Sequence, residues 1–174
     1  MNVYVYNKTQ FDKLMEFNHI NDSNVEVRTE IFLISIVDTH IHNPFGDGPE
    51  SKKFEKQLVD LLDHHFQKDH NNVMNLEFDD CEHDGQASPT NASNETKAFS
   101  EEQASKLFEF IKQNRDRKTC IVHCMAGISR SAAVAEFVNG YCQGDWEEFK
   151  RRHPRICPNA RVSRLLNKVK YLNG

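Results

Sequence analysis

The chain has 174 residues, of which 38% are hydrophobic and 28% are charged, and its formal net charge is −4. This length suits one domain over residues 1–174 and is too short for a (β/α)₈ barrel of typical size. No stretch approaches the roughly 18 consecutive apolar residues of a membrane span, so we expect a soluble protein without a membrane partner.

The five cysteines form an odd set without paired C-x-x-C spacing. This pattern indicates neither a disulfide framework nor a zinc ribbon, and it fits a reducing compartment. The N-terminus lacks the basic and apolar regions of a signal peptide. We therefore expect a cytoplasmic protein, and the sequence leaves its oligomeric state open.

Short apolar runs predict strands along the first two thirds of the chain. They lie at residues 3–6, 25–28, 31–37, 73–78 and 120–123. Several of these runs are too apolar to have a solvated face, which is typical of strands at the centre of a sheet.

Helical periodicity separates and follows these strands. It covers residues 51–66, 104–111, 134–141 and 162–169. Two pairs, Ser100 with Gln103 and Asp145 with Glu148, have the spacing of capping boxes at helix starts. The alternation of strand and helix predicts an α/β fold with a mostly parallel central sheet, flanked by helices on both faces and joined by right-handed crossovers. Residues 84–97 have the composition of a mobile surface loop.

The stretch "HCMAGISRS", residues 123–131, lies between the last predicted strand and a helix. Cys124 is expected where the strand ends, and Arg130 in the first helical turn. Unpaired backbone N–H groups and the helix dipole make such a turn a cradle for an anion, and Gly127 lets the backbone bend inward. The same field favours the thiolate form of a cysteine. The guanidinium of Arg130 matches two phosphate oxygens.

A thiolate at the base of a phosphate cradle can attack phosphorus, form a thiophosphoryl intermediate and release an alcohol or a phenol. This chemistry needs no metal and no cofactor, so we expect neither. A lone buried cysteine is usually an inert small hydrophobe. Here a cysteine, a glycine, an arginine and flanking hydroxyls fall at one strand-to-helix junction, which favours the catalytic interpretation.

The segment "VHCMAGISRSAA" resembles the H-C-x5-R-[ST] signature of the protein-tyrosine-phosphatase superfamily. Its "AGISRSA" form is most similar to compact dual-specificity phosphatases, including bacterial and phage-encoded ones. The resemblance extends from the "ISIVD" strand to the "PNARVSRLL" helix and leaves residues 1–24 and 85–97 uncovered. It implies the cysteine-phosphatase fold.

The resemblance also implies a role for each residue of the motif. Cys124 is then the nucleophile, Arg130 the phosphate clamp, His123 a residue that orients the loop and tunes the thiolate, and Ser131 a hydroxyl that eases breakdown of the intermediate. The phosphate loop consists of Met125, Ala126, Gly127, Ile128, Ser129 and Arg130. Taken from the residues alone, His123 also reads as a core histidine and Ser131 as a helix-start serine.

Expelling the leaving group needs a proton donor on a separate loop. Asp79, Asp80 and Asp84 follow a predicted strand, at the sheet edge where open α/β folds keep their sites. The residues alone do not separate them. The resemblance implies Asp80, because the acid closes a pattern similar to "LEFDD" in small dual-specificity phosphatases.

The motif residues between Cys124 and Arg130 carry no charge. Inositide phosphatases with a similar cradle tend to carry basic residues there, so the resemblance favours a phosphorylated protein or peptide substrate, with phosphotyrosine and dual specificity preferred. A second hypothesis is that the substrate is an RNA end or a nucleotide, which would be attracted by four arginines near the C-terminus: Arg151, Arg152, Arg155 and Arg161. Nucleic acid is therefore a possible but not a favoured partner.

Three alternative functions are a metal site, a phosphate-binding module without activity, and arsenate reduction. His40 and His42 in "DTHIH" form an H-x-H pair typical of metal-binding barrels, which four further histidines could complete, but the chain is too short for that barrel. A catalytically dead phosphate-binding module usually lacks the cysteine, the arginine or the acid. Arsenate reductases and small tyrosine phosphatases carry C-x5-R near the N-terminus. Cys81 is a candidate redox partner of Cys124.

Overall fold

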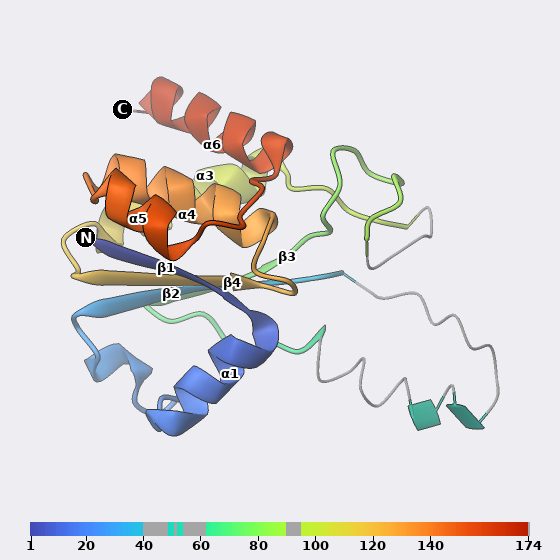
Figure 1. Ribbon diagram of the computed structural model, residues 1–174, viewed down its shortest axis with the longest axis horizontal. Coiled ribbons are helices and arrows are strands. Elements are labelled where there is room, and N and C mark those ends of the chain that lie inside the picture. The colour runs from blue at the N-terminus through green and yellow to red at the C-terminus, as the bar shows by residue number, and fades with distance from the viewer. Residues whose placement is uncertain (40–48, 51, 54–61, 90–94, 174) are drawn as a thin grey trace.

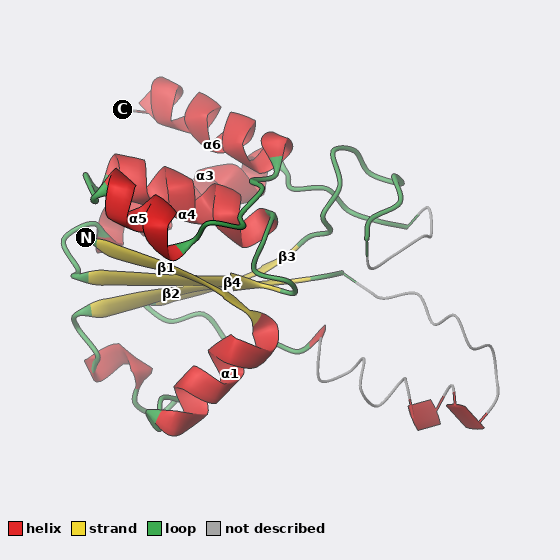
Figure 2. Ribbon diagram, in the orientation of Figure 1, coloured by secondary structure: helices red, strands yellow, loops and turns green. Residues whose placement is uncertain are grey.

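The computed structural model describes residues 1–39, 49–50, 52–53, 62–89 and 95–173. Four parallel strands form one sheet in the order β1-β4-β2-β3 (Figures 1 and 2). They are β1 (Asn2–Asn7), β2 (Ile31–Val37), β3 (Val73–Glu77) and β4 (Thr119–Cys124). The prediction of an α/β fold with a parallel sheet is confirmed. Four of the five predicted strands are present.

Helices cover both faces of this sheet, as predicted (Figure 1). One face carries α3 (Glu101–Asn114), α4 (Arg130–Tyr141), α5 (Trp146–Arg152) and α6 (Ala160–Asn173). The other face carries α1 (Lys8–Phe17) and the short 3₁₀ helix η1 (Val25–Val27). Because neighbouring side chains on a strand point to opposite faces, β4 contributes Val122 and Cys124 to the larger core and Ile121 to the core beneath α1.

The predicted strand at residues 25–28 is wrong, because this segment forms η1. Two valines separated by one residue imitate the alternation of a strand. In the structure only Val25 is buried, whereas Val27 is 75% exposed. The Asn72 side chain donates a hydrogen bond of 2.8 Å to the carbonyl of Val25 and thereby holds the turn against the core.

The predicted helix at residues 51–66 lies largely outside the described residues. Its last positions, His65 and Phe66, are described and lie in bends rather than in a helix.

Helix α1 was not expected from the strand-like N-terminal pattern. It begins with a reciprocal capping box between Asn7 and Gln10, and it buries Phe11 and Met15 at helical spacing. The capping signal was therefore present in the sequence, directly after a strand. The box at Ser100 and Gln103 is confirmed.

At α5 only half of the second predicted box forms. Asp145 accepts a hydrogen bond from the backbone N–H of Glu148. The Glu148 side chain instead accepts from Arg151 and Arg152, and these bonds lower the pKa of Glu148 to about 2.

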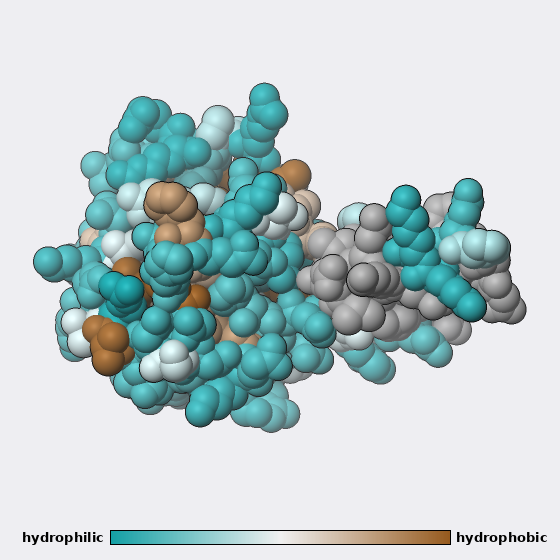
Figure 3. Space-filling model, turned by 90° about the horizontal axis from the view of Figure 1, so that it is seen from below, coloured by the Kyte–Doolittle hydropathy of each residue, from teal (hydrophilic) through white to brown (hydrophobic). Residues whose placement is uncertain are grey.

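Among the described residues, no helix combines the length and the apolar character needed to cross a bilayer. Figure 3 shows the side that carries α1 as mostly hydrophilic, with small separate apolar spots.

Candidate active site

The motif loop lies at the carboxyl ends of the parallel strands, between β4 and α4 (Figure 2). Cys124 is the last residue of β4 and Arg130 the first of α4, as predicted. Backbone N–H groups from two other parts of the chain hold the loop. Lys8 donates to the carbonyl of Met125 at 3.2 Å, and Cys157 donates to that of Ile128 at 2.8 Å. The loop is thus fixed from both sides.

Gly127 occupies the turn of the loop with a φ of +69°. A Cβ atom at this position would lie 2.7 Å from the backbone nitrogen of Asn7 and 2.8 Å from the carbonyl of Tyr6. The junction of β1 and α1 therefore presses directly on the loop. Both the backbone conformation and the space require glycine here.

We expect Gly127→Ala to distort the loop and to lower stability by about 1–3 kcal/mol, because the left-handed conformation and the backbone clash both act against a side chain. Thermal unfolding and vanadate binding measure the two effects. Gly140→Ala is the matched control, since a Cβ there meets nothing within 4 Å. If Gly127→Ala binds vanadate as wild type does, the close approach of β1 is not needed for the loop's shape.

Cys124 and Ser131 lie together at the base of the loop, and both are buried. The Cys124 Sγ is 3.1 Å from the Ser131 Oγ, so the hydroxyl can donate a hydrogen bond to a thiolate. Cys124 opens onto a cavity of about 230 Å³. Its other lining residues are Asp80, Pro89, Met125, Ala126, Ile128, Ser129 and Arg130. Most of its wall is apolar.

Arg130 is buried and held by two acceptors. Its Nη1 lies 2.9 Å from the Asp38 Oδ1 and donates to the carbonyl of Phe78 at 2.6 Å. Asp38 follows β2 and is itself buried. Sequence reasoning did not single out Asp38 as a site residue, although "ISIVD" belongs to the segment that carries the resemblance. The ion pair fixes the guanidinium beside the cavity.

The three candidate aspartates have different surroundings. The Asp80 Oδ1 accepts hydrogen bonds from the Ser129 Oγ at 2.7 Å and from the Asn159 Nδ2 at 2.8 Å, and Asp80 lines the cavity. Asp79 is fully buried and accepts from backbone and side-chain groups of Thr39 and from the backbone of Lys97. Asp84 is exposed and accepts from the backbone of a neighbouring loop. Of the three, only Asp80 lines this cavity.

Asn159 is a second residue that sequence reasoning did not single out. Besides contacting Asp80, its backbone N–H donates to the carbonyl of Ser129 at 3.2 Å. Its side-chain oxygen accepts from the backbone of Val162 in the first turn of α6. Asn159 therefore connects the aspartate, the motif loop and the start of α6 through its side chain and its backbone.

His123 points to the face of the sheet opposite to Cys124, as expected for adjacent residues of a strand. It is completely buried, and its ring packs against that of Phe11 with centroids 4.2 Å apart. Burial lowers the pKa of His123 to about 3, so the ring is neutral at pH 7. Its Nε2 lies 2.7 Å from the Ser35 Oγ. His123 does not line the cavity.

Cys81 is buried, and burial raises the pKa of its thiol, while a hydrogen bond with Thr96 acts in the opposite direction. It is not among the residues that line the cavity. The Cys81–Cys124 redox pair stays a prediction.

The basic residues near the C-terminus are partly occupied. Arg151 and Arg152 pair with Glu148, and Arg161 donates to the carbonyls of Glu82 and Phe99. Among the described residues, no group of three or more His, Cys, Asp or Glu could hold a metal ion. His40 and His42 lie outside those residues.

No protein-family model matches the chain, and no curated protein matches it either. Among solved structures, it is similar to Tk-PTP in its active form, with 17% identity over 86% of this chain and 85% of that one and a TM-score of 0.39. It is also similar to the human tyrosine phosphatase-like serine/threonine/tyrosine-interacting protein, with 19% identity, coverage of 87% and 85%, and a TM-score of 0.43. Neither match identifies an activity for this chain.

Proposed function

We propose that the protein is a cysteine-dependent phosphomonoesterase. The observation that carries this proposal is the gathering of Cys124, Arg130 and Asp80 around one cavity of about 230 Å³. Each of the three comes from a different part of the fold: the end of β4, the start of α4 and the loop after β3. A thiol, a guanidinium and a carboxyl group are the three groups that phosphate-ester cleavage through a cysteine requires.

In the first step the Cys124 thiolate attacks phosphorus, so that a P–S bond forms while the bond to the leaving oxygen breaks. Arg130 binds the equatorial phosphate oxygens together with backbone N–H groups of the loop. Asp80 gives its proton to the leaving oxygen. Both of its donors within the described residues bind Oδ1, so Oδ2 can hold that proton.

In the second step water attacks phosphorus and the P–S bond breaks. Asp80, now a carboxylate, takes a proton from the water. Ser131 stabilises the departing thiolate, because its hydroxyl lies 3.1 Å from the sulfur. Inorganic phosphate leaves, and the enzyme returns to its starting state. No metal enters either step.

The substrate we propose is a phosphorylated protein, with phosphotyrosine preferred and phosphoserine or phosphothreonine also accepted. Pro89, Met125 and Ile128 give the cavity apolar walls that suit an aromatic stem. Of the four arginines that would attract RNA, Arg151 and Arg152 share an ion pair with Glu148, and Arg161 donates to two backbone carbonyls. An RNA-end, nucleotide or inositol phosphatase with the same mechanism is the alternative.

A substrate panel tests this proposal. We expect a higher kcat/KM for phosphotyrosyl peptides than for inositol phosphates, nucleotides or RNA 5′ ends at physiological salt. A burst of product from an aryl phosphate would show turnover through an intermediate and exclude a dead binding module. Equal or higher kcat/KM on RNA ends would overturn the protein substrate and leave the cysteine mechanism standing.

A further inference from the structure

A chain of three polar side chains runs beneath the sheet, on the face opposite to the cavity. Ser35 in β2 is the register partner of His123 in β4, and both are completely buried. The Ser35 Oγ lies 2.7 Å from the His123 Nε2 and 2.7 Å from the His64 Nδ1. This hydrogen-bonded chain ends at His123, the residue that precedes Cys124 in β4.

We propose that Ser35 and His64 are positioning residues for Cys124 and act on it through His123. This inference rests on the proposed role of Cys124 as a nucleophile. The three side chains come from β2, from the segment before β3 and from β4, so their hydrogen bonds tie the end of β4 to two other parts of the fold.

The serine forces the two histidines into opposite roles. A hydroxyl has one proton, so it donates to one imidazole and accepts from the other. Both rings are neutral at pH 7, since burial lowers the pKa of His64 to about 4 and that of His123 to about 3, and the charge of the buried Lys8 acts in the same direction. Each ring therefore carries one N–H, and the proton position on His64 determines the position on His123.

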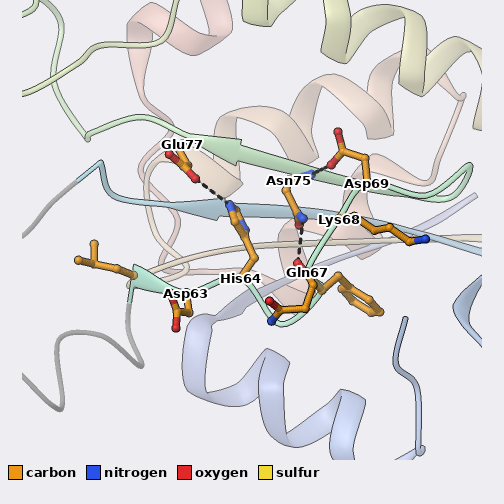
Figure 4. Close-up of a pocket in the computed structure, with 9 residues that line it drawn as sticks. Asp63, His64, Gln67, Lys68, Asp69, Asn75 and Glu77 are labelled. Carbon is orange, nitrogen blue, oxygen red and sulfur yellow. Dashed lines mark hydrogen bonds and ion pairs between the residues drawn. The ribbon is translucent and has the colours of Figure 1, made fainter. Parts of the chain in front are cut away.

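The surroundings of His64 bear on which of the two proton positions its ring adopts. His64 forms part of the wall of a cavity of about 390 Å³, and its Nε2 lies 3.9 Å from the Glu77 Oε1 (Figure 4). A carboxylate at that distance attracts an N–H and repels a lone pair. This contact favours the proton of His64 on Nε2, with Ser35 donating to the His64 Nδ1. At the other end, a backbone hydrogen bond with Cys124 acts to raise the pKa of His123 against the larger effect of burial, and it favours the opposite direction, with Ser35 donating to the His123 Nε2.

The hydrogen bond between Ser35 and His123 fixes the His123 ring and, with it, the peptide from which Cys124 projects. Phe11 packs against the ring and limits its movement further. Without the serine hydroxyl the buried Nε2 of His123 would lose its hydrogen-bond partner, and the ring would turn to find another. The Cys124 sulfur would then lose its alignment with Ser131 and with bound phosphate. A misplacement of about 1 Å can cost ~100-fold in rate.

The test breaks the hydrogen bonds among Ser35, His64 and His123 by replacing Ser35 or His64. We expect Ser35→Ala and His64→Leu to lower kcat on an aryl phosphate about 10-fold, with KM changed less than about twofold. Both variants should also slow the alkylation of Cys124 by iodoacetamide. His64→Asn places an amide near the former Nδ1, and we expect it to restore most of the loss. His65→Leu is the matched control, because His65 is also half-buried but bonds to Ile20 and Asp12 instead.

Several outcomes would overturn the inference. One is an unchanged kcat and alkylation rate in His64→Leu, with only a lower unfolding temperature. Another is a His64→Asn variant as impaired as His64→Leu, since packing rather than hydrogen bonding would then be at work. If Ser35→Ala fails to fold, the two His64 variants still decide. If the wild type hydrolyses no phosphate ester, the proposed function fails, and the alkylation rates alone test the positioning of Cys124.

Discussion

Cys124→Ser should abolish turnover of every phosphate ester, by at least about 10³-fold, and still bind phosphate or vanadate. A serine hydroxyl in the same cradle stays protonated, so it cannot attack phosphorus. The motif loop is held by backbone groups of Lys8 and Cys157, and the Arg130 guanidinium at its end is held by Asp38. None of these contacts depends on the sulfur, so binding should survive.

Stopped assays on an aryl phosphate, together with vanadate titration, measure the two properties separately. Cys142→Ser is the matched control, since Cys142 caps the far end of α4 and should be dispensable. Activity should also survive EDTA. Turnover close to wild type in Cys124→Ser, or its loss on chelation, would falsify the cysteine mechanism.

The fold was predictable where sequence pattern and burial agree. The strands at residues 31–37 and 120–123 are apolar because both of their faces are buried, and such runs have few alternatives. The error at residues 25–28 arose because two valines one residue apart satisfy the strand pattern without a neighbouring strand. Local pattern does not contain the pairing partner, and only the pairing makes a strand.

The candidate site divides in the same way. The motif loop is local, so Cys124, Arg130 and Ser131 could be placed at one strand-to-helix junction from their order alone. Asp38 and Asn159 approach that loop from distant parts of the chain, and single acidic or amide residues after a strand or before a helix carry no distinctive signal. Their roles became visible only from contacts with Arg130 and Asp80.

Asp80→Asn should slow the reaction about 100-fold with phenyl or alkyl phosphates and less than about 10-fold with activated nitrophenyl esters. A poor leaving group needs a proton as the P–O bond breaks, whereas a nitrophenolate leaves without one. The amide can still accept from Ser129 and Asn159 through its oxygen, so the loop should keep its geometry. The variant thus removes the proton and little else.

Asp79→Asn is the matched comparison, because the two aspartates are adjacent and only their contacts differ. The Asp79 carboxylate accepts hydrogen bonds from Thr39 and from Lys97. In Asp79→Asn the new NH₂ group would face these donors at a position where a carboxylate oxygen accepts in the wild type. We therefore expect a loss of about 1–3 kcal/mol in stability, with rates reduced equally for good and poor leaving groups. A plot of log kcat/KM against leaving-group basicity separates the two variants by its slope. If the steep slope appears in Asp79→Asn instead, the proton donor is Asp79, and the loop after β3 must turn by one residue when substrate binds.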